Sequence, residues 1–338
     1  MIAPPQRPDT QSVARLTEMA DYVVPFALRA VCDLRIADHL AAGPMPIGEL
    51  AELSGTHAPT LERTLRALAC KGVFTEVCPG VFGLTALAEP LRSDHPLSLR
   101  SAYPLLAAEI SAWGRLDHTL RTGKAAFDEA HGTSFWRYLE EHPAESRRFD
   151  ASQQAVTRRE LRAVLSCYDW SSLGTIVDVG GGNGAFLAGI LAAHPAARGI
   201  LLDQPHVVAA APDVLAEAGV GDRCRVSPGS FFDSVPGGGD AYLLKRILYG
   251  WDDQRALELL RVVRRAMPVG SRLLLLEPIA ESGDDFSWGK LYDLLLVAMG
   301  GGGARTRVEL EKLFAGAGLE LTRVVQTRML PVIEARAI

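Results

Sequence analysis

The stretch VDVGGGNGAF, Val177 to Phe186, decides the fold. An apolar strand runs into a glycine turn, and the turn leads at once into an apolar helix. Glycines at 180, 182 and 184 let the backbone approach a bound ligand where a side chain would clash. The spacing alone does not identify the ligand, because a dinucleotide fingerprint prefers a third glycine where Ala185 stands, and alanine is an accepted substitute.

The residues around this stretch predict a parallel sheet. From Ser172 onward, apolar strand-like segments alternate with helical ones; they are TIVDVGGG, GILLDQP, CRVSPGS, DAYLLKRIL and SRLLLLEPI. Such alternation is typical of an α/β, doubly wound sheet covered by helices on both faces. We therefore expect a domain over residues 170–338.

Two aspartates suggest what this domain binds. Asp178 lies in the first strand, two residues before the turn, and Asp203 ends the next strand. A carboxylate at the tip of the second strand can accept both ribose hydroxyls of a nucleoside. The alternative is that Asp203 caps the turn before Pro205. We interpret it as part of an adenosine site.

The first half of the chain is predicted to be helical. Residues 13–42 carry apolar residues at helical spacing and predict one long amphipathic helix, ended by Gly43 and Pro44. Residues 46–85 then predict helix, turn, helix and two short strands, which is the layout of a winged helix. We assign residues 1–12 to a disordered N-terminus, 13–97 to the winged-helix domain and 98–169 to a helical, aromatic-rich connector.

Composition excludes several classes of function. The chain has 338 residues and a net charge of -5, whereas binding to nucleic acid needs a basic surface. Its five scattered cysteines form no CxxC pair, so neither a metal site nor a disulfide framework is predicted. With no apolar run of about 18 residues and no secretory signal pattern, we expect a cytoplasmic protein without a membrane partner.

Six segments together resemble a known family. They are VDVGGGNGAF, LLDQP, PGSFFDSVP, DAYLLKRILYGWDD, LLLLEP and GGGGARTRVELEKLFAGAGL. In order and spacing the chain is similar, from about residue 13 onward, to the S-adenosylmethionine-dependent small-molecule O-methyltransferases. The resemblance implies a Rossmann-like class I methyltransferase domain, a mainly α winged-helix dimerisation domain, and S-adenosylmethionine as cofactor. The long N-terminal helices carry too much apolar surface to stand alone, so we expect a homodimer.

The resemblance also implies roles for residues at the cofactor. The glycine loop would hold the methionine part, Asp203 the ribose and Phe231 the adenine, with Lys245 nearby. The full set of expected cofactor-binding residues is Asp178, Gly180, Gly182, Gly184, Asp203, Gln204, Ser230, Phe231 and Lys245. Ser230 departs from the family, which usually has an acidic residue there; without charge assistance we expect somewhat weaker cofactor binding.

The catalytic motif departs further. Family members that methylate phenols use the histidine of H-D-W-x-D as a base, but this chain has Tyr249 there. A free tyrosine, with a pKa near 10, is almost never ionised at pH 7. Of the two acidic residues that orient the base, Glu277 is kept and the other is replaced by Ala304. Arg246 stands where the family usually has an aromatic residue or histidine; it is either a surface cation or a ligand for a carboxylate or oxyanion.

Three interpretations remain open. We favour methyl transfer by proximity and orientation, without a dedicated base, to an oxygen or alternatively a nitrogen or carbon. The second uses an unrecognised base such as Tyr249, Glu277, His118 or His131. The third keeps the fold but catalyses hydroxylation, decarboxylation or ring closure, as relatives with altered base motifs do. The catalytic candidates are Tyr249, Glu277 and Arg246.

We expect the substrate pocket to be lined by aromatic and apolar side chains. The candidates are Trp113 and Phe149 of the connector and the helix from Tyr292 to Met299. Such a lining suits a polyketide or another ring-bearing natural product, and the resemblance implies a role in secondary metabolism such as antibiotic biosynthesis. Outside the enzyme classes, the alternative is a winged-helix DNA-binding regulator, against which the acidic composition argues.

Overall fold

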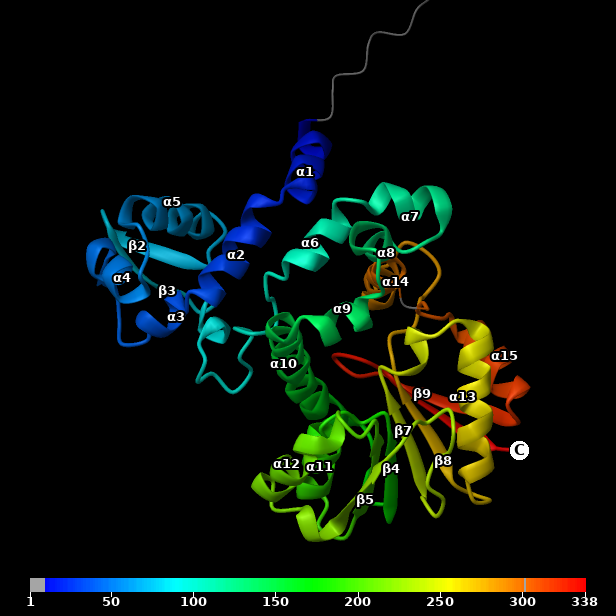
Figure 1. The fold of residues 1–338 in the computed structure, drawn as a ribbon. Helices are drawn as coiled ribbons and strands as arrows, with labels where there is room; N and C mark the ends of the chain where they lie inside the picture. Colours follow the sequence, from blue (N-terminus) through cyan, green and yellow to red (C-terminus); the bar gives the residue numbers. More distant parts are fainter. Residues whose placement is uncertain (1–9, 301) are drawn as a thin grey trace, which may run out of the picture. The chain divides into compact units, whose positions relative to one another are not determined.

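The computed structural model describes residues 10–300 and 302–338 and divides into two compact units (Figure 1). The first unit comprises the described residues up to Leu105 together with Arg148–Ala155. The second comprises Leu106–Arg147 and Val156–Ile338. Helix α10 (Pro143–Cys167) contributes residues to both units, so the chain enters the first unit twice.

The N-terminal segment forms three helices, so the prediction of one long helix over residues 13–42 is wrong. They are α1 (Thr10–Ala20), α2 (Val23–Asp33) and α3 (Ile36–His39). Pro25 has no N–H to donate to the preceding turn, and the Asp21 carboxylate instead accepts the amides of Val23 and Val24 at the start of α2. Arg35, with a left-handed φ of 57°, separates α2 from α3.

The predicted disorder over residues 1–12 falls mainly outside the described residues. Residues 1–9 are not described, whereas Thr10–Ser12 already belong to α1. This part of the prediction is therefore wrong for the last three residues.

The predicted winged-helix elements are present in the first unit. They are strand β1 (Met45–Pro46), helices α4 (Ile47–Ser54) and α5 (Ala58–Ala69), and strands β2 (Phe74–Cys78) and β3 (Val81–Leu84). The strands pair antiparallel in the order β1-β3-β2. Leu50, Leu65, Phe74 and Phe82 are fully buried and form the centre of this core.

The connector predicted to be helical over residues 98–169 contains helices from Ala107 onward, whereas residues 98–106 form turns and coil. Its helices are α6 (Ala107–Trp113), α7 (Leu116–Thr122), α8 (Ala126–His131), α9 (Phe135–Glu141) and α10 (Pro143–Cys167). The aromatic residues divide between core and surface: Phe127 and Phe135 are buried, whereas Trp113 and Trp136 are exposed.

A seven-stranded sheet organises the second unit. The strands are β4 (Thr175–Val179), β5 (Arg198–Asp203), β6 (Cys224–Pro228), β7 (Ala241–Lys245), β8 (Arg272–Leu276), β9 (Leu319–Val325) and β10 (Val332–Ala337). Their order is β6-β5-β4-β7-β8-β10-β9. The first five are parallel, which confirms the predicted doubly wound sheet. The sequence prediction missed the last two strands, which run antiparallel to their neighbours.

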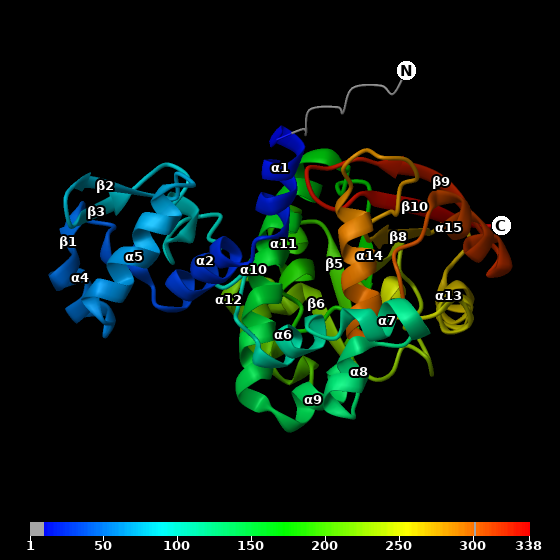
Figure 2. The same ribbon diagram turned by 90° about the horizontal axis from the view of Figure 1, so that it is seen from above.

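Helices cover both faces of this sheet, as Figures 1 and 2 show. The end of α10 packs on one face with α11 (Ala185–Ala193) and α12 (Ala211–Glu217). Helices α13 (Asp253–Ala266) and α15 (Arg307–Gly316) pack on the other. Strand β7 contributes side chains to the cores on both faces. Leu243 points to the first face, and its neighbours Tyr242 and Leu244 point to the second. The remaining helix, α14 (Trp288–Met299), contacts α6, α7 and α8.

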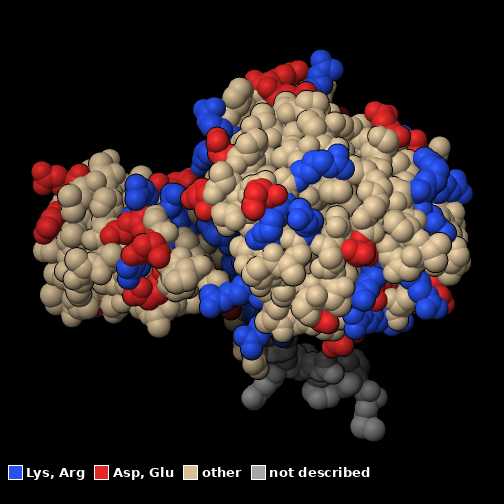
Figure 3. All heavy atoms as spheres, turned by 90° about the horizontal axis from the view of Figure 1, so that it is seen from below, with Lys and Arg blue, Asp and Glu red and all other residues tan. Residues whose placement is uncertain are grey.

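The described residues contain neither a membrane-spanning helix nor a cluster of metal ligands. No helix in them is long and apolar enough to cross a membrane. Within residues 10–300 and 302–338, no cluster of His, Cys, Asp and Glu could hold a metal ion. On the face drawn in Figure 3, acidic and basic side chains are interspersed.

Candidate active site

The glycine loop joins β4 to α11 at the carboxyl edge of the sheet. Gly180, Gly182 and Gly184 all have left-handed φ angles, of 74°, 64° and 80°. A Cβ on Gly180 would come within 2.5 Å of the Ile247 side chain, and one on Gly181 would overlap the Asp178 carboxylate. The loop therefore has no room for side chains at Gly180 and Gly181, and its backbone is uncovered where the sequence predicts a ligand.

Asp203 ties this loop to the end of β5. Its Oδ2 accepts the amide of Gly182 at 2.8 Å, and its Oδ1 accepts the amide of Gln204 at 2.7 Å. The carboxylate thus orders the backbone, as in the capping interpretation. Each oxygen keeps a second lone pair, so Asp203 can still accept ribose hydroxyls.

Asp178 is the least satisfied polar group at the site. It is fully buried, and neither carboxylate oxygen has a hydrogen-bond partner among the described residues. Burial raises its pKa to about 7, although Lys245 lowers it. A buried carboxylate without a donor, next to a bare glycine loop, fits the ammonium group of an amino acid moiety such as that of S-adenosylmethionine.

Phe231 lies against the same loop. Its ring edge would be 3.3 Å from a Cβ on Gly180, and its ring centroid is 4.9 Å from that of Phe232. The Ser230 hydroxyl accepts the amide of Phe232 at 3.2 Å. The structure therefore brings the predicted adenine-packing residue to the glycine loop.

Two cations at the end of β7 share one buried carboxylate, Glu160 of α10. Arg246 donates from Nε and Nη2 to Glu160 Oε1, at 2.8 and 2.5 Å. Lys245 Nζ donates to Glu160 Oε2 at 3.2 Å and to Thr157 at 3.1 Å. Arg246 is thus not a surface cation, since its side chain is 10% exposed and that of Glu160 0%. Glu160 was not predicted, because its neighbours in the sequence, Arg158, Arg159 and Arg162, suggest a solvated helix face.

Tyrosines surround the Arg246 guanidinium. Arg246 Nη2 donates to the Tyr292 hydroxyl at 3.3 Å, and the guanidinium carbon lies 4.9 Å from that ring centre. Tyr249 lies close enough to Arg246 for the guanidinium to act on the pKa of its phenol. Burial raises the pKa of Tyr249 above its usual value, and Arg246 only partly opposes this. Tyr249 is therefore a protonated phenol at neutral pH.

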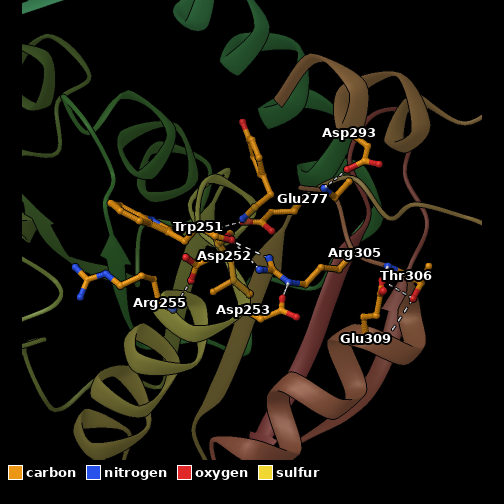
Figure 4. A network of polar contacts seen from close by, with 12 residues as sticks. Trp251, Asp252, Asp253, Arg255, Glu277, Asp293, Arg305, Thr306 and Glu309 are labelled. Atoms are coloured by element: carbon orange, nitrogen blue, oxygen red, sulfur yellow. Dashed lines mark hydrogen bonds and ion pairs between the residues drawn. The ribbon is translucent and has the colours of Figure 1, made fainter. Parts of the chain in front are cut away.

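Glu277, at the end of β8, holds the loop that carries Tyr249. Its Oε1 accepts the amides of Leu248 and Tyr249, the latter at 3.1 Å. Burial raises its pKa to about 8. Two backbone amides thus bind one oxygen of this carboxyl group (Figure 4).

Arg305 fixes the same loop from the other side (Figure 4). It donates to the carbonyls of Leu248 and Trp251, at 3.2 and 2.7 Å, and to Asp253 at 2.9 Å. At Ala304, where the family has an acidic residue, the backbone amide donates to Asp293 of α14 at 3.0 Å.

The predicted substrate-lining residues divide between the two units. Tyr292 lies in the cluster around Arg246, Met299 is buried near the end of α14, and Trp113 ends α6 with 38% of its surface exposed. Phe149 belongs to the first unit.

The two histidines considered as bases make other contacts in the helical segment. His131 Nε2 lies 2.7 Å from the Ser111 hydroxyl and 3.0 Å from the Ala108 carbonyl. His118 lies 3.9 Å from Glu129.

Comparison with known proteins gives the same picture over nearly the whole chain. An O-methyltransferase domain matches residues 113–320, and an O-methyltransferase dimerisation domain matches residues 17–94. The phenazine O-methyltransferase PhzM of Lysobacter antibioticus is 44% identical over 96% of this chain and 95% of its own. The 2,7-dihydroxy-5-methyl-1-naphthoate 7-O-methyltransferase of Streptomyces carzinostaticus is 36% identical over 96% and 97%.

A solved structure agrees with the fold and with the cofactor. The neocarzinostatin O-methyltransferase NcsB1, in complex with S-adenosylmethionine and 2-hydroxy-5-methyl naphthoic acid, superposes with a TM-score of 0.79. It is 34% identical and the match covers 95% of this chain and 98% of that one. The chain therefore belongs to the S-adenosylmethionine-dependent O-methyltransferases that form homodimers through an N-terminal dimerisation domain.

Proposed function

We propose that this enzyme methylates an aromatic hydroxyl group of a small, ring-bearing natural product without a histidine base. The observation that carries the proposal is Tyr249, a half-buried phenol with a raised pKa that lies near Arg246 at the position of the family's base. The names of the relatives, a phenazine and a naphthoate O-methyltransferase, support an aromatic substrate. An amine or an activated carbon is the alternative acceptor.

The cofactor roles rest on the geometry of the loop. We propose that Gly180, Gly182, Gly184 and Asp178 hold the amino acid end, and that Asp203 and Gln204 border the ribose. Phe231 and Ser230 would face the adenine, with Lys245 beside Asp178, whose pKa it lowers. When bound, S-adenosylmethionine supplies a sulfonium methyl group that needs no further activation.

The remaining residues would then position the acceptor. Holding a nucleophile in line with a reactive methyl group can supply most of the acceleration. Glu277 acts in this proposal as a positioning residue, because its carboxyl group is occupied by the amides that place Tyr249. Trp113, Phe149, Tyr292 and Met299 stay predicted substrate contacts.

The test is intact-mass analysis of hydroxylated phenazines and naphthoates incubated with the enzyme, with and without S-adenosylmethionine. We expect a gain of one methyl group, with S-adenosylhomocysteine formed in equal amount. Asp203→Asn should raise the KM for S-adenosylmethionine and leave that for the acceptor nearly unchanged. Turnover of substrate without S-adenosylhomocysteine would contradict the proposal and favour hydroxylation, decarboxylation or ring closure. The cytoplasmic location and the lack of a nucleic-acid partner stay predictions.

A further inference from the structure

The cluster at the end of β7 carries more positive than negative charge. Lys245 and Arg246 both pair with Glu160, whose side chain is completely buried. Asp178 also lies near Lys245, but burial raises its pKa to about 7, and in the proposed site it pairs with the cofactor's ammonium group, so one positive charge is left over. Buried charge of one sign favours a ligand of the other sign.

Arg246 is held in an uncommon conformation. Its φ of 58° lies in the left-handed region, which a residue with a long side chain rarely adopts. The backbone amide donates to the Leu276 carbonyl at 3.0 Å, and the guanidinium is fixed by Glu160. Both the backbone and the side chain of Arg246 are therefore fixed by hydrogen bonds, and a strained backbone conformation held in this way is typical of functional positions.

The guanidinium lies next to two tyrosines. Arg246 has donors but no acceptor, so the Tyr292 oxygen must accept from it, and Tyr249 lies near the same positive charge. The Tyr292 phenol then keeps its own hydrogen for another acceptor. Tyr249 stays protonated and can donate, and a nearby positive charge makes a hydroxyl group a stronger donor.

These donors lie next to the cofactor loop. Ile247, between Arg246 and Tyr249, approaches Gly180 so closely that a Cβ there would be 2.5 Å from its side chain. An acceptor held by the two tyrosines is therefore near the loop that binds the cofactor.

We propose that Tyr249 and Tyr292 are a pair of hydroxyl donors, placed beside Arg246 and Glu160, that binds the oxygen of the substrate as a phenolate. This inference rests on the proposed function and specifies its substrate class: acidic phenols that lose their proton to solvent before or on binding. The phenolate oxygen forms the new bond to the methyl carbon while the carbon–sulfur bond breaks, and that electron pair returns to sulfur. Anion and sulfonium become two neutral products, so no base has to accept a proton.

The first test measures binding rather than turnover. Hydroxyphenazines and hydroxynaphthoates, whose absorbance changes on ionisation, are titrated with pH on the enzyme loaded with S-adenosylhomocysteine. We expect the pKa of the bound phenol to lie lower than in water by about 1 or more. Tyr249→Phe and Tyr292→Phe, which remove one oxygen each, should abolish most of this difference. Tyr138→Phe is the matched control, because that hydroxyl bonds to Glu145 in α10.

The second test follows kcat/KM with pH for phenols of graded pKa. The rising limb should move with the pKa of the substrate, and Tyr249→Phe should lower kcat by about 10-fold or more for the less acidic phenols. Arg246→Lys and Glu160→Gln should flatten this dependence on substrate acidity, as expected of positioning residues. If Glu160→Gln does not fold, the tyrosine variants still decide the question.

The outcomes separate this inference from the proposed function. A rising limb at one fixed pH for all phenols would show a protein base and overturn the inference. So would a bound phenol with its ordinary pKa, or no phenol binding at all, even if S-adenosylhomocysteine forms with some acceptor. Failure to form S-adenosylhomocysteine with any acceptor would instead overturn the proposed function.

Discussion

At the scale of a single residue, Asp178 shows how a group that is placed for a ligand lowers the stability of the ligand-free protein. Burial raises its pKa from 3.8 to about 7, a difference that corresponds to about 4 kcal/mol when the group is ionised. In the unfolded chain the carboxyl group loses its proton near pH 4, whereas in the folded protein it keeps it to about pH 7. The ligand-free enzyme should therefore lose stability as the pH rises between these values.

Replacement of this carboxylate tests that relation. Asp178→Asn should make the unfolding free energy of the ligand-free enzyme flatter between pH 4 and 7, measured by urea denaturation. The same variant should gain less thermal stability from S-adenosylhomocysteine at pH 8, because the ammonium loses its counterion. Asp222→Asn, at an exposed aspartate, controls for the loss of one charge. Identical pH curves for the wild type and Asp178→Asn would show that this carboxylate is not desolvated in solution.

Arg305 is the second residue whose removal is informative. The guanidinium is buried and donates to two backbone carbonyls of the loop that carries Tyr249. Arg305→Met leaves these carbonyls without their donor, and we expect a loss of about 2 to 4 kcal/mol in unfolding free energy and a lower kcat. Arg307→Met is the control, because Arg307 is exposed and pairs with Glu311 one turn away; it should change stability by about 0.5 kcal/mol or less. Equal losses in the two variants would contradict the role of Arg305 as a clamp.

At the scale of elements, the loop that carries Tyr249 and the loop that carries Gly302 and Gly303 determine each other's shape. Gly303 donates its amide to the Tyr249 carbonyl at 2.8 Å, and a Cβ on Gly302 would overlap the Trp251 backbone. Gly302→Ala should therefore push the loops apart, with a cost of about 1 to 3 kcal/mol and a larger fall in kcat than rise in KM for S-adenosylmethionine. Gly250→Ala, in the same loop, meets nothing within 4 Å and should be tolerated. Thermal melts and steady-state kinetics of this pair test the contact, and full activity of Gly302→Ala would refute it.

Elements with a strong local signal were predictable from the sequence. The strand, glycine turn and helix around Gly180 follow from residue type and spacing, and so does the position of Asp203 at the end of the next strand. The break between Ala20 and Val23 was missed, because the prediction of one helix over residues 13–42 rested on the apolar period alone. The final strands β9 and β10 were missed, since β9 alternates polar and apolar residues unlike the continuous apolar strands before it.

The cluster around Glu160 could not be predicted in the same way. Glu160 lies 86 residues before Arg246 in the sequence, and the charged residues that flank it are typical of an exposed helix. The contact depends on α10 packing beside the end of β7, and this tertiary packing cannot be deduced from the local sequence. The missing histidine indicated an altered site, but the structure was needed to show which groups surround Tyr249.

At the scale of the whole molecule, we expect the N-terminal helix to contact a second copy of the chain. No residue of α1 is buried in the described structure, yet the helix presents Val13, Leu16 and Met19 to solvent. The dimerisation domain of the family matches from residue 17, in the middle of α1. An apolar stripe on such a domain is expected to be covered in the homodimer.

Charge on this stripe should therefore separate the two copies. Leu16 and Met19 are three residues apart on one helical face and are 65% and 72% exposed, so Leu16→Glu with Met19→Glu costs the isolated chain little. In the dimer the two carboxylates would be buried without partners, and we expect the dissociation constant to rise by about 100-fold or more. Light scattering coupled to gel filtration over a dilution series measures this, with circular dichroism to confirm the fold. Leu120→Glu, on the exposed face of α7 outside the matched domain, is the control. A double variant that stays dimeric at every dilution would place the dimer contacts away from α1.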